Sequence, residues 1–152
     1  MVRKIFSTLL MLSVMLAGSA AFADYQKYLG GDRNYILFDG IQGIGRYVYK
    51  PSLSVDEYKP PRYVISIDWV SVEDADRGKT EIYSRNHLRF GYDWDARKIY
   101  FVNDSGEWKM IDPEGSRASG SAFAGAAEIA FALAYNLKFL GIYSENFYDF
   151  MR

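Results

Sequence analysis

The clearest pattern in the chain is the alternation of apolar and polar residues over positions 80–94. The apolar residues of one parity are Ile82, Leu88, Phe90, Tyr92 and Trp94, and the polar residues of the other are Glu81, Arg85, His87, Arg89 and Asp93. A period of two predicts a β-strand with one face in the core and one in water, which is typical of antiparallel sheets.

A similar period occurs in residues 62–73, where we expect Tyr63, Ile65, Ile67 and Trp69 to face the core. Shorter apolar runs predict further strands at residues 34–39, 46–50, 98–102 and 107–111. The last two flank the turn sequence of residues 103–106 and predict a hairpin. Residues 51–61 hold three of the four prolines and are interpreted as a loop.

The period changes to three and four between residues 118 and 140. The apolar positions there are Ala122, Phe123, Ala126, Ile129, Ala130, Leu133, Leu137 and Leu140. This spacing predicts a helix that begins near Ser119 or Ser121 and ends before Gly141. The alternative is a membrane span or surface helix, but Glu128, Asn136 and Lys138 are costly in lipid.

Strands followed by one helix predict an α+β fold. We expect an antiparallel β-sheet of five to six strands with one C-terminal helix packed on its apolar face. This domain covers residues 34–141, after a flexible polar lead-in at residues 24–33. Residues 142–152 form an aromatic C-terminal tail, which we expect to pack back on the domain.

The N-terminus has the three parts of a secretory signal peptide. Arg3 and Lys4 precede an uncharged apolar run, and small residues at Ala21 and Ala23 fit a signal-peptidase site. We therefore predict a signal peptide at residues 1–23. An uncleaved anchor is the alternative, although the apolar run is shorter than the roughly 20 residues of a membrane span.

Composition narrows the classes of function. Cleavage would leave 129 residues, and the formal charge would change from −1 to −3 because two basic residues are lost. This charge makes duplex nucleic acid a poor partner. The chain has no cysteine, which excludes disulfides, cysteine zinc sites and thiol nucleophiles. Hydrophobic residues make up 49% of the chain, which is typical of a folded domain.

No arrangement typical of an enzyme stands out. His87 is the only histidine, and Ser84 is predicted on the opposite strand face, so a serine triad is not favoured. The acid pairs at Asp74 and Asp76 and at Asp93 and Asp95 lack the ligand spacing of a calcium loop. The glycines of residues 40–45 have the wrong order for a dinucleotide fingerprint. We predict no catalytic, cofactor or metal site.

Tyrosine and tryptophan supply large contact areas at low entropic cost. The candidate protein-contact residues on the wet side are Tyr47, Tyr49, Tyr58 and Tyr83. Trp69, Trp94 and Trp108 share parity with aliphatic neighbours and are predicted in the core.

Four segments together resemble the surface-adhesin protein E-like domain of small exported bacterial proteins. They are residues 35–39, 63–69, 92–100 and 106–116, and the similarity covers about residues 35–140. The resemblance implies a compact antiparallel sheet with a packed helix and no catalytic site. Some members of that family are adhesins that bind host matrix proteins.

The sequence thus favours an exported, non-enzymatic domain of the periplasm or cell surface, whose partner is an envelope or extracellular protein. The resemblance implies that its role is adhesin-like. We expect no nucleic-acid partner and no membrane span after signal cleavage. The alternative is a small periplasmic ligand-binding or inhibitor module that uses an aromatic groove. A hydrolase that relies on acids such as Asp93 and Asp95 is a third hypothesis.

Overall fold

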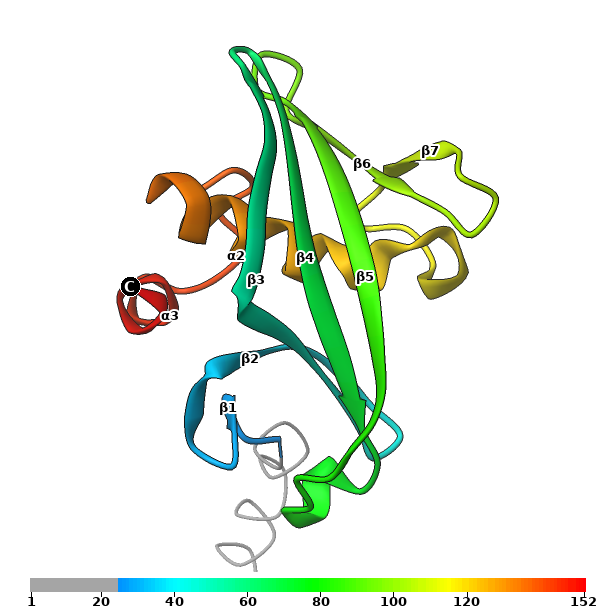
Figure 1. Ribbon diagram of the computed structural model, residues 1–152, viewed down its shortest axis with the longest axis vertical. Helices are drawn as coiled ribbons and strands as arrows, with labels where there is room; N and C mark the ends of the chain where they lie inside the picture. Colours follow the sequence, from blue (N-terminus) through cyan, green and yellow to red (C-terminus); the bar gives the residue numbers. More distant parts are fainter. Residues whose placement is uncertain (1–24) are drawn as a thin grey trace, which may run out of the picture.

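The computed structural model describes residues 25–152, so the predicted signal peptide lies outside the described residues. The fold is α+β, as predicted, with an antiparallel sheet and a helix after it (Figure 1). The sheet has seven strands in consecutive order rather than five or six. They are β1 (Tyr28–Leu29), β2 (Asp32–Ile41), β3 (Ile44–Lys59), β4 (Arg62–Val72), β5 (Ile82–Asp93), β6 (Lys98–Val102) and β7 (Trp108–Ile111).

Two segments predicted as irregular belong to this sheet. Residues 24–33, expected as a flexible lead-in, contain β1 and the start of β2, and Leu29 is buried there. Residues 51–61, expected as a loop, lie mostly in β3. The prolines are tolerated because the β3–β4 register shifts between Tyr49 and Ser54, and because the cis Pro60–Pro61 bond lies in the turn that follows.

The predicted helix over residues 118–140 is shorter than expected. Two short 3-10 helices, η2 (Arg117–Ser119) and η3 (Ser121–Phe123), precede α2 (Ala124–Tyr135). Gly120 separates them with a φ of 87°, a left-handed conformation that interrupts a continuous helix. Asn136, rather than Gly141, ends α2, with a φ of 55° and its N–H donating to the Ala132 carbonyl.

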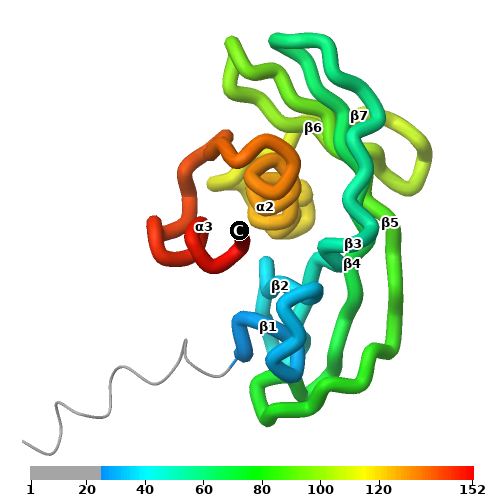
Figure 2. The backbone as a smooth tube through the Cα atoms, turned by 60° about the vertical axis from the view of Figure 1, so that its left-hand side comes forward, coloured from blue at the N-terminus to red at the C-terminus, as the bar shows by residue number. Residues whose placement is uncertain are grey.

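Helix α2 lies across one face of the sheet, which we call the inner face, and the sheet curves around it (Figure 2). The predicted core positions Ile65 and Ile67 are fully buried beneath it. Phe131 of α2 is the aromatic centre of this core, because its ring packs against five others. These rings belong to Tyr63, Tyr92, Trp94, Tyr135 and Phe139. Among residues 25–152, no helix has both the length and the apolar character needed to cross a bilayer.

A second hydrophobic cluster lies on the outer face, near the end of the sheet where β1 and β2 curl. Val70 and Val72 alternate with the inner-face residues of β4 and pack with Tyr47, Leu29 and Ala75. The 3-10 helix η1 (Ala75–Arg77) supplies Ala75 to this cluster. Both faces of β4 are therefore buried near its C-terminal end, which the alternating pattern did not predict.

The C-terminal tail packs back on the domain, as predicted, and forms a short helix, α3 (Glu145–Met151). Its attachment depends on Glu128, which is fully buried in α2. The Glu128 carboxylate accepts hydrogen bonds from the Tyr148 hydroxyl at 2.6 Å and the Leu140 N–H at 2.6 Å. It also accepts bonds from the N–H groups of Phe139 and Gly141, both at 3.1 Å. This carboxylate therefore joins α2, the loop after it and α3.

Candidate functional site

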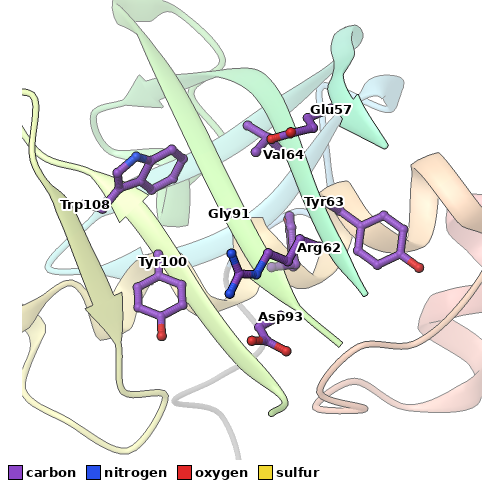
Figure 3. A pocket seen from close by; sticks show the side chains of 9 residues that line it. Glu57, Arg62, Tyr63, Val64, Gly91, Asp93, Tyr100 and Trp108 are labelled. Carbon is purple, nitrogen blue, oxygen red and sulfur yellow. The ribbon is translucent and has the colours of Figure 1, made fainter. Parts of the chain in front are cut away.

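An open groove of about 400 Å³ lies on the outer face, across β3 to β7 (Figure 3). The strand register explains its position. Val64 pairs with Gly91, Gly91 with Tyr100, and Tyr100 with Met110, so these residues form one row across four strands. Residues directly opposite each other on adjacent antiparallel strands have their side chains on the same face of the sheet. The row therefore combines three apolar or aromatic side chains with one position that has no side chain.

Gly91 forms the floor of the groove beneath the indole of Trp108. A Cβ atom at residue 91 would lie 3.1 Å from the Trp108 ring. The backbone there is ordinary extended strand, so the requirement for glycine is one of packing rather than of conformation. The Arg89 guanidinium lies over the same ring, 5.8 Å from its centroid. Trp108 is still 46% exposed, and Met110 is 52% exposed.

Charged side chains surround the aromatic part of the groove. Arg62 and Asp93 are register partners on β4 and β5, and Figure 3 shows Arg62 near the centre of the view with Asp93 beside it. Asp93 accepts a hydrogen bond from the Ala96 N–H at 3.0 Å. Glu57 is paired with Lys59 at 2.8 Å, and this hydrogen bond and charge lower the pKa of Glu57. The groove thus presents an aromatic wall and charges of both signs.

Such a surface can bind a partner through apolar contact and polar hydrogen bonds. Trp, Tyr, Met and Arg are the residue types enriched where protein interfaces bury most of their energy. An indole and a phenol beside a guanidinium and a carboxylate also suit saccharides or peptides. These contacts require no reaction at any of the lining groups.

The structure does not bring the four predicted contact tyrosines together. Tyr47 is only 1% exposed, because it packs in the second cluster, and burial with the neighbouring Tyr25 raises its pKa to about 12. The prediction of Tyr47 on the wet side is therefore wrong. Tyr49 stacks on Tyr35 with ring centroids 4.9 Å apart, and Arg85 lies over it.

The two remaining tyrosines are exposed but lie far apart. Tyr58 is 63% exposed at the end of β3 and packs against the rings of Tyr63 and Tyr135. Tyr83 is 53% exposed at the start of β5. Tyr63 pairs with Tyr92, nine residues after Tyr83, so about 30 Å of strand separates them. Their separation argues against one shared contact surface.

The other candidate groups are on the surface. The His87 Nδ1 lies 2.8 Å from the Asp68 carboxylate, and the His87 side chain is 63% exposed. Within residues 25–152, no hydroxyl group makes a hydrogen bond to His87. The part of the chain that the structure describes contains no group of three or more His, Cys, Asp or Glu residues placed to hold a metal ion.

The sequence patterns did not identify the groove residues, and they predicted Trp108 in the core. β7 is the last strand of the sheet, and only Ile111 of its residues is buried. Parity alone could not show which side of this short strand the helix would cover. The one available signal was the pair Trp108 and Met110 on the same side of a strand that faces Tyr100.

Comparison with protein-family models, with curated proteins and with solved structures finds no match to this chain. The resemblance to the surface-adhesin protein E-like domain stays a prediction from the sequence.

Proposed function

We propose that this protein is an exported, non-enzymatic domain of the cell envelope or cell surface that binds another protein, in an adhesin-like role. Three features support the proposal. They are the signal-peptide pattern of residues 1–23, the exposed aromatic groove, and the resemblance of residues 35–140 to an adhesin-containing family.

The observation that carries the proposal is the exposure of Trp108 above Gly91. An indole that is 46% exposed at the edge of a groove offers a large apolar area to a partner. Tyr100 and Met110 extend this area on neighbouring strands. When residues of this kind dominate the centre of an interface, their replacement by alanine commonly costs about 2 kcal/mol or more each.

The test is a solid-phase binding screen of the purified protein against extracellular-matrix and envelope proteins, followed by titration of any partner found. Trp108→Ala should weaken binding at least tenfold, which corresponds to about 1.4 kcal/mol. Tyr83→Ala is the matched control, because Tyr83 is similarly exposed and lies outside the groove. The absence of saturable binding, or equal binding by both variants, would contradict the proposal.

A second candidate is a ligand-binding or inhibitor module that recognises a sugar or peptide. Its support is the aromatic wall of Trp108 and Tyr100 beside Arg62 and Asp93. Titration with oligosaccharides, monitored by tryptophan fluorescence, separates the two functions. A saturable fluorescence change on adding oligosaccharide, which Trp108→Phe removes, favours the sugar site. No fluorescence change with oligosaccharide, together with saturable binding of a protein partner, favours the leading proposal.

Export can be tested independently of binding. N-terminal sequencing of the protein recovered outside the cytoplasm should begin at Asp24. A sequence that begins at Met1 on exported protein would contradict the predicted cleavage.

A further inference from the structure

Strand β5 has one open edge over most of its length. It pairs with β4 from Ile82 to Asp93, but β6 pairs with it only from Phe90 to Asp93. Before Phe90 the two strands diverge, and β6 and β7 point away from β5 (Figure 1). Residues 82–89 therefore have a neighbouring strand on one side only.

The hydrogen-bond pattern identifies which backbone groups face this open edge. The Trp94 N–H donates to the Pro61 carbonyl at 2.8 Å, and residue pairs in the β4–β5 ladder then follow in steady register to Ser71 and Ser84. In an antiparallel ladder, alternate residues point their N–H and C=O groups at the partner strand and the others point away. The even positions of β5 therefore bond to β4.

The odd positions Arg85, His87 and Arg89 direct their N–H and C=O groups at the open edge. Within residues 25–152, no hydrogen bond outside the strand ladders reaches these backbone groups. A row of unpaired backbone donors and acceptors is a template for an added strand.

A groove of about 480 Å³ lies beside this edge. Asn86, His87 and Leu88 line it on β5. Its other wall is formed by β6 with the following Asn103 and Asp104, and by the segment around η2 and η3, which includes Arg117. Its apolar lining comes from Trp69, Phe101 and Phe123, whose rings also pack on one another. This groove is distinct from the outer-face groove at Gly91, because it opens on the inner side of the sheet.

The outer side of the same edge carries basic side chains at alternate positions. Arg85, His87 and Arg89 are all exposed. His87 and Arg89 are paired with Asp68 and Asp56. Arg85 has no carboxylate partner among the described residues and lies over the Tyr49 ring at 4.8 Å from its centroid. Arg85 therefore leaves one positive charge without a carboxylate partner on the outer side of the edge, where an acidic group is favoured, and the rings on the inner side favour apolar groups.

We propose that the open edge of β5 binds an extended peptide segment of another protein, which adds a strand to the sheet over residues 83–89. The segment has an acidic side chain opposite Arg85, and apolar side chains at the alternate positions that enter the groove lined by Trp69, Phe101 and Phe123. An extended segment of seven residues matches the length of residues 83–89, because both strands rise about 3.3 Å per residue. The inference is independent of the Trp108 groove.

The probe is the fluorescein-labelled peptide Glu-Val-Glu-Val-Glu-Val-Glu, acetylated and amidated at its ends. We expect a saturable rise in fluorescence anisotropy with added protein. We also expect slower hydrogen exchange at the amides of Arg85, His87 and Arg89, which face the open edge. The amides of Asn86 and Leu88 serve as internal controls, because they already bond to β4.

Substitution of His87 tests the role of the backbone. His87→Pro removes one outward N–H group without removing a bond to β4 and should weaken peptide binding at least tenfold. His87→Ala, which keeps the N–H group, should bind within threefold of the unaltered protein. Circular dichroism checks that both variants are folded.

A second measurement does not depend on the folding of His87→Pro. Two peptides of the same sequence, N-methylated at the Glu or at the Val positions, present different edges to β5. The peptide whose methylated N–H groups face β5 should lose binding, and the peptide whose methylated groups point away should keep it. Equal binding by both, or no saturable binding of the unmethylated peptide, overturns the proposal. It is also overturned if the edge amides are already protected in a self-associated form of the free protein, because a second copy then occupies the edge.

Discussion

Replacement of Glu128 by glutamine removes the charge of the buried carboxylate and nearly preserves its volume. The carboxylate accepts four hydrogen bonds, from the N–H groups of Phe139, Leu140 and Gly141 and from the Tyr148 hydroxyl. Glutamine keeps only one acceptor oxygen. Its amide nitrogen must then face an N–H donor, which leaves both groups without a partner.

The cost can be worked out bond by bond. One oxygen accepts only from Leu140, so the smallest loss is this bond, at about 1.5–3 kcal/mol for a bond to a charged group. The three bonds that remain change from charged to neutral acceptors, at about 1 kcal/mol each. The neutral amide costs less to bury than a carboxylate, which offsets part of the loss. We expect a net loss of about 3 kcal/mol.

Urea denaturation followed by circular dichroism measures this loss. For a domain of this size, about 3 kcal/mol also lowers Tm by roughly 10–15 °C. Glu107→Gln is the matched control, because Glu107 is exposed and its contact with Lys109 at 3.7 Å is a surface ion pair. The control should change the free energy of unfolding by less than about 0.5 kcal/mol.

Local exchange provides a second readout in the Glu128→Gln variant. The amides of residues 139–141 should exchange faster, because they lose their acceptor or face a weaker one. Equal stability of Glu128→Gln and Glu107→Gln, with unchanged exchange at residues 139–141, would refute the argument that Glu128 holds the C-terminal segment.

Three further predictions concern other parts of the fold. Gly91→Ala should displace the Trp108 indole and increase its quenching by acrylamide, since the added Cβ would lie 3.1 Å from the ring. Tyr47→Phe should make the protein less sensitive to alkaline pH. The pKa of Tyr47 is about 12 in the folded protein and about 10 in the unfolded chain. Tyr47 therefore contributes stability below pH 10 that is lost as pH rises through 12. At pH 11 the unaltered protein should therefore lose about 1 kcal/mol more of its free energy of unfolding, measured in urea, than Tyr47→Phe does. Asn136→Ala should lower the free energy of unfolding by about 1 kcal/mol, because its φ of 55° is left-handed.

Each of these predictions has a clear opposite result. Unchanged quenching in Gly91→Ala would mean that the indole does not rest on residue 91. An identical fall in stability between pH 8 and pH 11 in Tyr47→Phe would exclude this phenol as a cause. Asn136→Gly is the control at the end of α2, and it should be at least as stable as the unaltered chain, because glycine adopts positive φ without strain.

The regular alternation of residues 80–94 was enough to predict β5 and its buried face, where Leu88, Phe90 and Tyr92 are at most 5% exposed. The sheet and the packed helix could be predicted for the same reason, since periodicity reports which side of an element is covered. The length of the helix could not. Its apolar period continues to Leu140, but the chain turns at Asn136, which adopts a left-handed conformation, and residues 139–141 then bond to Glu128.

The errors elsewhere arise where contacts distant in sequence change the pairing or the covering of a strand. Prolines in residues 51–61 indicated a loop, whereas register shifts allow β3 to continue through Pro51. Near Val70, η1 covers the outer face, so Tyr47 is buried although it was expected on the wet side. At β7 the register places Trp108 on the outer side with Tyr100 and Met110. Local patterns specify two faces, but long-range contacts decide what covers each of them.

Every strand of the sheet is hydrogen-bonded to strands adjacent in sequence, so the ladder up to Ile111 is complete without any later residue. The helices that cover its apolar side all come after it. A chain truncated at residue 112 would keep its full strand pairing while Ile65, Ile67 and Phe90 met water, and should aggregate through that face. Residues 113–152, supplied as a separate peptide, should restore its solubility. The C-terminal segment thus supplies the cover that keeps the inner face of the sheet out of water.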